Sequence, residues 1–304
     1  MAIITPALLS GLRTGFSKAF QDSLTNTPTD WEKVATRVPS SSASNTYGWL
    51  GQFPTLREWV GDRVLKDMAA QAYQVQNKLY EGTVAVKRTD IEDDNVGVYT
   101  PLFSEMGRAA KAHADQLVFG LLAAGETTTC YDGQNFFDTD HPVYPNVDGT
   151  GAPTLVSNYD NGGASPGPAW YLLDTSRALK PLIFQERTTP ELEAMTATND
   201  EVVFTSDTYR YGVRYRCNAG FGFWQLAYKS KAALNAGNFN SAMAAMMQVK
   251  ADGGRPLGVK PTTLVVPPSL RAAALSLIEA QLTTGGESNP NYKAVEVIVS
   301  PWLA

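Results

Sequence analysis

The segment between residues 100 and 125 constrains the fold of this chain most strongly. Its apolar residues recur at helical spacing and form one stripe, which contains Phe103, Met106, Ala110, Ala114, Leu117, Leu121 and Leu122. Thr100 is predicted as the N-cap, Pro101 as the first helical residue and Gly125 as the stop. About 24 residues rising 1.5 Å each give a helix of roughly 36 Å. A helix of this length can serve as the backbone of a whole subunit.

A second segment, residues 46–82, combines large aromatic residues with charges and glycines. A short stretch of this kind cannot build its own core, and large aromatics in such a place usually become buried against another chain. We therefore expect an arm that lies on a neighbouring subunit. The alternative, that these aromatics pack within their own subunit, stays open. The candidates for inter-subunit contact are Trp49, Phe53, Arg57, Trp59, Asp62, Arg63 and Lys66.

Composition excludes several classes of protein. The 304 residues are 43% hydrophobic and 18% charged, which is ordinary for a globular chain, and the net charge of −5 argues against a dedicated nucleic-acid binder. Cys130 and Cys217 form no metal or disulfide motif, so we expect two thiols in a reducing compartment. The N-terminus lacks the basic residues of a signal peptide, and the longest apolar run, 117–124, is too short to span a bilayer. We expect a cytosolic protein that does not enter membranes.

The remaining pattern predicts mixed helices and strands, an α+β chain. Helical spacing marks residues 2–24, whereas 90–95 is an acidic turn. Residues 170–228 are rich in β-formers, and residues 239–299 alternate between helix and strand. Predicted strands are 83–87, 182–184, 202–204, 209–217, 263–266 and 295–299, and predicted later helices are 239–250 and 269–282.

One constellation could carry chemistry, Asp138, Asp140 and His141, in a loop-rich region. Carboxylate oxygens and an imidazole suit a divalent cation such as Mn²⁺ or Zn²⁺. The spacing matches neither an EF-hand nor a zincin, and Asp residues also stabilise turns through backbone hydrogen bonds. We favour the structural turn and predict no catalytic, cofactor-binding or metal-ligating residue and no cofactor.

Several runs of specific residues resemble the major head (capsid) protein of Mu-like tailed phages and prophages. The resemblance is carried by Tyr-Glu-Gly-Thr-Val-Ala-Val-Lys-Arg-Thr-Asp-Ile-Glu-Asp-Asp (80–94), Cys-Tyr-Asp-Gly-Gln-Asn-Phe-Phe-Asp-Thr-Asp-His-Pro (130–142), Asn-Ala-Gly-Phe-Gly-Phe-Trp-Gln-Leu-Ala-Tyr (218–228), Gly-Gly-Arg-Pro-Leu-Gly-Val-Lys-Pro-Thr-Thr-Leu-Val-Val-Pro-Pro-Ser-Leu (253–270) and Val-Ser-Pro-Trp-Leu (299–303). These runs are spread over most of the chain.

The resemblance implies the Hong Kong 97-type capsid fold. Residues 1–45 would form the N-terminal arm, 46–82 the extended β-hairpin loop, 83–238 the peripheral domain and 239–304 an α/β segment like the axial domain. The spine helix of the peripheral domain would be 97–124. In the usual order of this fold the axial elements follow the spine helix, but here the β-rich segment 170–228 comes between them.

The implied function is structural. Copies would self-assemble into hexamers and pentamers of an icosahedral head that encloses double-stranded DNA without sequence specificity, assembled in the host bacterial cytoplasm and retained in the virion. The implied partners are a portal protein, a separate scaffolding or protease protein and a possible decoration protein. Two alternatives stay open: a metal-dependent hydrolase that uses Asp138, Asp140 and His141, and an encapsulin-like protein compartment.

Overall fold

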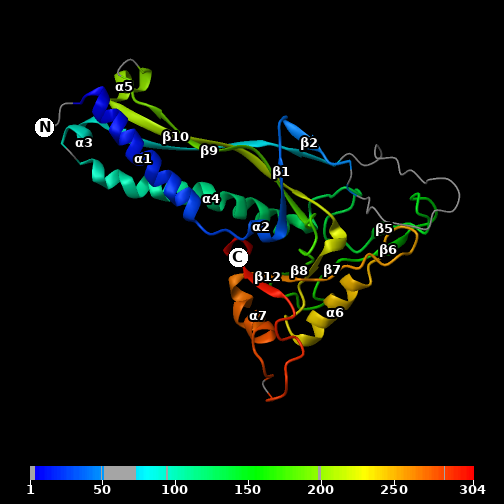
Figure 1. The fold of residues 1–304 in the computed structure, drawn as a ribbon. Helices are drawn as coiled ribbons and strands as arrows, with labels where there is room; N and C mark the ends of the chain where they lie inside the picture. Colours follow the sequence, from blue (N-terminus) through cyan, green and yellow to red (C-terminus); the bar gives the residue numbers. More distant parts are fainter. Residues whose placement is uncertain (1–3, 49, 51–72, 94, 198–199, 284) are drawn as a thin grey trace.

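The computed structural model describes residues 4–48, 50, 73–93, 95–197, 200–283 and 285–304. Within these residues the chain forms two lobes (Figure 1). The elongated lobe consists of two long helices on a four-stranded sheet, and the compact lobe is built on a five-stranded sheet with two shorter helices. The α+β fold class predicted from the sequence is thereby confirmed.

The long predicted helix is α4, Thr100–Ala123, and it runs the length of the elongated lobe. Its start differs by one residue from the prediction. The N-cap is Tyr99, because the 3₁₀ turn η2, Val96–Tyr99, leads directly into the helix and Thr100 already has helical dihedral angles. Pro101 therefore takes the second helical position, where its missing N–H is still harmless. Ala124 is the C-cap, and the short turn η3, Ala124–Glu126, follows it.

Helix α1, Pro6–Asn26, lies beside α4 (Figure 1). The Thr5 hydroxyl caps its first turn by accepting from the backbone N–H of Leu8 at 3.2 Å. The helix predicted from the spacing of residues 2–24 is confirmed, and its buried side chains are Leu9, Phe16 and Phe20. This helix covers the spine helix of its own chain, so the described part of residues 1–45 is packed onto the subunit body.

The four-stranded sheet has the order β1-β9-β10-β4. Its centre is the antiparallel pair β9, Leu182–Met195, and β10, Thr208–Phe221, which are the longest strands described. Strand β4, Lys78–Lys87, pairs antiparallel with β10, and β1, Ala35–Pro39, pairs parallel with β9. Strand β10 alternates along its N-terminal half. Its buried side chains there are Tyr209, Tyr211, Val213, Tyr215 and Cys217.

The five-stranded sheet of the compact lobe has the order β13-β12-β8-β11-β7. Its central strand β8, Trp170–Leu173, is buried along its whole length, as is its neighbour β12, Thr263–Val266. The other strands are β11 (Ala227–Ser230), β7 (Tyr159–Asp160) and β13 (Glu296–Val299). Helices α6 (Ala236–Met247) and α7 (Arg271–Ile278) complete this lobe.

Strands of the two sheets alternate along the sequence. The β-rich segment 170–228 contributes β8 and part of β11 to the compact lobe, whereas its long β9–β10 pair belongs to the elongated lobe. The compact lobe therefore begins soon after α4, and the chain then returns to the elongated lobe before completing it. The expected boundary between residues 238 and 239 remains a prediction, and strands from both of its sides share the five-stranded sheet.

Smaller elements connect these parts. Two short antiparallel pairs, β2 with β3 and β5 with β6, stand apart from the main sheets. No helix in the described ranges is long and apolar enough to cross a membrane. The remaining elements are β2 (Ser44–Thr46), β3 (Gln74–Gln76), β5 (His141–Val143), β6 (Thr154–Val156), α2 (Trp31–Val34), η4 (Trp224–Leu226), η5 (Pro268–Leu270) and η6 (Pro301–Leu303).

Two local predictions were wrong because the surrounding chain overrides the residue pattern. Residues 202–204 were predicted as a strand, but they lie in helix α5, Glu201–Ser206, which ends at Asp207 in the left-handed conformation. Here the chain turns from β9 into β10, and a short helix makes that reversal. Residues 90–95 were predicted as a turn, but helix α3, Arg88–Glu92, occupies the first part. The carboxylate of Glu92 accepts from Arg88 one helical turn away, which supports this helix.

Candidate functional site

The aromatic segment predicted to contact a neighbour is held firmly at its base. Strands β2 and β3 join its two ends, and the Tyr47 backbone N–H donates to the Tyr73 carbonyl at 2.8 Å. The buried Tyr47 hydroxyl donates to Gln185 Oε1 at 2.8 Å, and burial raises the pKa of Tyr47 to about 12, so this donor stays protonated at neutral pH. The seven interface candidates lie outside the described residues: Trp49, Phe53, Arg57, Trp59, Asp62, Arg63 and Lys66.

The far end of the elongated lobe, here called the distal tip, has a small core of its own. At its centre Phe16 stacks on Phe103 with ring centroids 4.2 Å apart and meets Tyr211 edge-on at 5.3 Å. This core joins the starts of α1, α4 and β10 with the ends of β4 and β9. Its buried members are Leu9, Phe16, Val86, Ile91, Phe103, Val203, Tyr209 and Tyr211.

Large apolar side chains remain exposed around this distal tip. Phe204 on α5 has 88% of its surface exposed, the largest value among the exposed apolar residues described. Val98 in η2, Leu102 at the start of α4 and Met195 at the end of β9 are each about half exposed. A soluble monomer rarely presents several large apolar side chains at one extremity, whereas an assembling subunit covers them with neighbours.

The compact lobe also ends in a projection. Residues 279–283 and 285–295, between α7 and β13, extend away from the sheet (Figure 1). Leu282 lies in this projection with 58% of its surface exposed, and it pairs with Ser288 in an isolated β-bridge. The described exposed apolar side chains therefore include members at opposite ends of the molecule.

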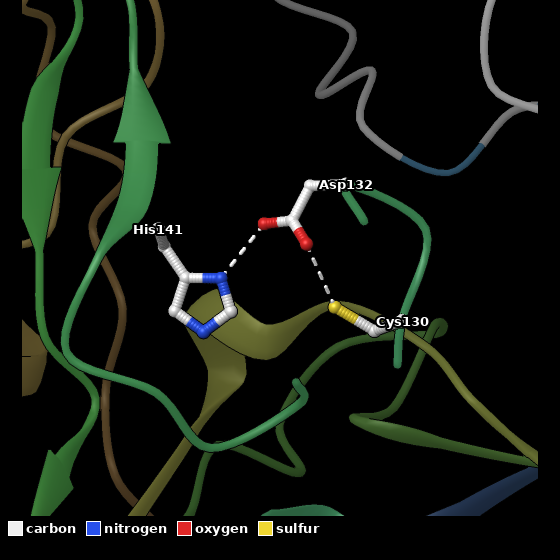
Figure 2. Close-up of side chains that lie close together, drawn as sticks. All are labelled: Cys130, Asp132 and His141. Carbon is white, nitrogen blue, oxygen red and sulfur yellow. Dashed lines mark hydrogen bonds and ion pairs between the residues drawn. The ribbon is translucent and has the colours of Figure 1, made fainter. Parts of the chain in front are cut away.

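His141, one of the three predicted ligands, meets Asp132 and Cys130 (Figure 2). The His141 side chain is fully buried and its ring stacks on Trp224, with centroids 4.0 Å apart and planes at 9°. His141 Nδ1 lies 2.7 Å from Asp132 Oδ2, and Cys130 Sγ lies 3.0 Å from Asp132 Oδ1. Asp132 and Cys130 stand in the same run of sequence as His141. The Asp132-Gly133 turn signal could have pointed to them.

The other two predicted ligands, Asp138 and Asp140, lie outside this cluster. Asp138 accepts from the backbone N–H of Thr139 at 2.7 Å, and its own backbone N–H donates to Asn158 Oδ1 at 3.0 Å. A hydrogen bond between the side chains of Asp138 and Asp140 raises the pKa of Asp140. Among the described residues, the metal-capable cluster that contains His141 includes neither of these carboxylates.

The protonation of the cluster limits its chemistry. Burial raises the pKa of the Cys130 thiol far above its usual range, and the Asp132 charge adds to this effect. Burial also opposes ionisation of Asp132, but hydrogen bonds to His141 and Cys130 outweigh it and lower the pKa of that carboxyl. Asp132 lies between the thiol and the imidazole, so His141 does not activate Cys130 as a nucleophile in this arrangement.

A partly buried ion-pair network was not predicted from the sequence. Glu126, just after α4, receives Lys229 Nζ at 2.6 Å and Lys231 Nζ at 2.8 Å. Lys229 is almost fully buried and also lies over the Phe137 and Tyr171 rings. Lys229 lies in β11 and Lys231 directly follows that strand, so this network ties the end of the spine helix to the compact lobe. No local spacing links residue 126 to 229, so only the fold reveals it.

The chain is similar in sequence to known phage head proteins. Residues 9–303 match the family described as Mu-like prophage major head subunit gpT. The Mu-like prophage FluMu major head subunit of Haemophilus influenzae is 52% identical over 284 residues, 93% of this chain and 92% of that protein. The major capsid protein of Escherichia phage Mu is 47% identical over 304 residues, 99% of this chain and 100% of that protein.

Solved phage structures agree with these matches. A chain of the procapsid of bacteriophage JBD30 aligns with a TM-score of 0.88 and 62% identity, covering 98% of this chain and 100% of that chain. A chain of the JBD30 capsid decorated with minor capsid protein trimers aligns with a TM-score of 0.77 and 44% identity, covering 100% of both chains.

Proposed function

We propose that this chain, which belongs to the Mu-like prophage major head subunit family, forms hexamers and pentamers of an icosahedral shell that encloses double-stranded DNA. Its membership makes it a capsid protein of a Mu-like phage head. The proposal adds how the subunits meet. The observation that carries it is the exposure of Phe204 and other large apolar side chains at the extremities of an elongated subunit.

The distal tip is the first proposed contact. Its small core fixes the elements that carry Phe204, Met195, Val98 and Leu102, so these side chains stand on an ordered surface rather than on a loose end. Apolar side chains gathered on a rigid surface contribute to association because little conformational entropy is lost when a partner covers them. We assign this tip to contacts among copies of the chain.

The segment between β2 and β3 is the second proposed contact. Support comes from its base, where Tyr47 is bonded to Gln185 and Val75 is buried in the main core. This base fixes the points at which the segment leaves and rejoins the subunit body. Trp49, Phe53 and Trp59 are the proposed anchors of this contact. The charged residues proposed to set the register between subunits are Arg57, Asp62, Arg63 and Lys66.

The projection that carries Leu282 is the third proposed contact, and it is assigned to the centre of each hexamer or pentamer. Each single contact needs only modest strength, because every subunit forms several and a closed shell sums them.

The net charge of the chain is compatible with a shell that holds DNA. A wall built from a chain of net charge −5 would enclose DNA but bind it weakly. A strongly cationic wall would bind the DNA tightly and impede its movement.

The proposal extends to other proteins of the head. As partners of this chain we propose a portal protein, a separate scaffolding or protease protein and a decoration protein of the kind named for the JBD30 capsid. We also propose that assembly takes place in the host cytoplasm. We propose no enzymatic activity. The two alternatives, a hydrolase and an encapsulin-like compartment, gain no support from the matches to phage head proteins.

Electron microscopy and sedimentation of the purified full-length chain test the proposal. Closed shells, tubes or hexameric rings are the expected products. A chain that remains monomeric at high concentration, both alone and with the scaffolding protein of its own prophage, would contradict it.

A further inference from the structure

The loop that follows α4 is built mainly from turns, yet it holds buried polar groups in fixed positions. The Cys130 backbone N–H donates to the Gln134 carbonyl at 2.8 Å, and the Gly133 N–H donates to the Cys130 carbonyl at 3.2 Å. Gly133 has a φ of +88°, which closes this tight turn at low steric cost. The turn places the side chains of Cys130 and Asp132 together, facing His141 at the start of β5 (Figure 2).

From this convergence we propose that Cys130, Asp132 and His141 form a buried site for a divalent transition-metal ion of the zinc type. The three residues each offer one ligand atom, and these atoms lie within 4.8 Å of one another. A thiolate, an imidazole and a carboxylate are the three ligand types found in protein zinc sites. Metal–ligand bonds of about 2.0–2.3 Å place ligand atoms roughly 3.4–3.6 Å apart in a tetrahedron, so small side-chain shifts would accommodate the ion.

The site is organised before any ion enters. Stacking on Trp224 fixes the plane of the His141 ring, and the Gln134 backbone N–H holds Asp132 Oδ1 at 3.1 Å. Asp132 and His141 have side-chain exposures of only 6% and 0%. The hydrogen bonds from Nδ1 and Sγ to Asp132 occupy the directions that a metal ion would take.

Charge balance favours a dication at this position. Binding through the thiolate releases the Cys130 thiol proton to solvent, and ligation by His141 Nδ1 leaves the imidazole proton on Nε2. The thiolate and the Asp132 carboxylate together carry two negative charges, which neutralise a divalent ion. A neutral cluster is the arrangement that such a buried position tolerates best. Three protein ligands leave a fourth position for water, as in other three-ligand zinc sites.

The ion would act as a staple. It would join the turn at Cys130–Gln134 to β5, and through the stacked Trp224 it would hold both against the core shared by the two lobes. This role is independent of the contacts proposed between subunits, because the site is buried within one chain.

Cobalt substitution tests the site in the full-length protein. Co²⁺ added during refolding should bind with one equivalent per chain and give a near-ultraviolet thiolate-to-cobalt charge-transfer band. Cys130→Ser should abolish the band, whereas Cys217→Ser, which changes the other buried cysteine, should retain it. Asp132→Asn should weaken Co²⁺ binding by about 100-fold, since loss of a direct ligand should cost at least as much as loss of an outer partner. A wild-type protein that shows no charge-transfer band overturns the proposal, as does a Cys130→Ser variant that keeps wild-type affinity.

A second test of metal binding uses only the wild-type chain, so it does not require any variant to fold. The wild-type chain, partly unfolded in denaturant, is treated with an alkylating reagent with and without Zn²⁺, and each cysteine is followed by mass spectrometry. Zn²⁺ should slow alkylation of Cys130 at least tenfold relative to that of Cys217. Equal protection of the two thiols, or no protection of Cys130, overturns the assignment.

Discussion

Gly107 of α4 lies directly against the backbone carbonyl of Phe20 in α1. A Cβ atom at Gly107 would stand 2.2 Å from that carbonyl oxygen and 3.1 Å from the Leu24 nitrogen. Both obstacles are backbone atoms, so they cannot move away as a flexible side chain would. The close approach of the two helices therefore requires glycine at this position.

Gly107→Ala should destabilise the subunit by about 2 kcal/mol, because the added methyl group forces α1 away from α4. Urea unfolding followed by circular dichroism measures the change. Gly120→Ala is the matched control on the same helix, since a Cβ there meets nothing within 4 Å. The control should be neutral or more stable by about 0.5–1 kcal/mol. Equal effects of the two substitutions would show that the helix contact is not the cause.

Glu126→Gln should destabilise the subunit by about 3 kcal/mol, because it leaves the buried ammonium of Lys229 without its counter-charge. Thermal unfolding of the variant measures the loss. Glu105→Gln is the comparison, since it removes a carboxylate paired with Arg108 on the exposed surface of α4, and its midpoint should match that of the wild type. If Glu126→Gln also matches the wild type, the network does not stabilise the junction between the lobes.

The same carboxylate should make stability depend on pH. Burial opposes ionisation of Glu126, but hydrogen bonds from Lys229 and Lys231 outweigh it, so its pKa is lowered from the ordinary value of 4.5. A depressed folded-state pKa gives stability that is present above the unfolded value and is lost as pH falls through the folded one. The difference in midpoint between wild type and Glu126→Gln should therefore be constant near pH 7 and shrink below about pH 4.5. A difference that grows on acidification would reverse this assignment.

Phe204→Asp should leave the isolated subunit folded but sharply reduce the yield of closed shells, because a charge would replace the most exposed apolar side chain of the distal tip. Sedimentation separates shells from free subunits, and circular dichroism checks the fold. Phe204→Leu keeps an apolar side chain at the same position and should assemble. A shell yield unchanged by Phe204→Asp would remove the distal tip from the proposed contacts.

Replacing Trp49, Phe53 and Trp59 together by alanine should prevent assembly while the thermal midpoint of the free subunit stays within a few degrees of the wild type. The reason is that these side chains are proposed to be covered by a neighbour and not by their own chain. Phenylalanine at positions 49 and 59 is the conservative control and should retain partial assembly. A large drop in the midpoint of the free subunit would instead favour packing within the subunit.

Elements whose structure follows from their local residue pattern could be predicted from the sequence. The extent of α4 and the run Thr263–Val266 were predicted closely, because helical periodicity and a block of β-formers bounded by prolines are strong local signals. Of the stripe predicted within α4, Phe103, Ala114 and Leu122 are buried, whereas Gly107, Val118 and Phe119 supply the rest of the buried face. Residues 202–204 show the limit. Their β-forming residues favour a strand, but the reversal between β9 and β10 requires a helix there, and no local signal reports that requirement.

The candidate cluster shows a similar limit. The sequence drew attention to the run from Cys130 to Pro142 but chose Asp138 and Asp140 as partners of His141, because they are nearest along the chain. The actual partner of His141 is Asp132, which also accepts from Cys130, and the turn around Gly133 brings these two residues back to it. Spacing along a sequence indicates contact within helices and strands, but not in a loop that folds on itself.

The parallel pairing of β1 with β9 has a consequence for synthesis. Ala35 is made early, but its partner Leu182 leaves the ribosome only after α4 and the first strands of the compact lobe. Pairing between such distant segments is slow and comes late. A nascent chain therefore lacks a finished subunit surface for most of its translation, and this delay separates the making of each copy from its recruitment by others.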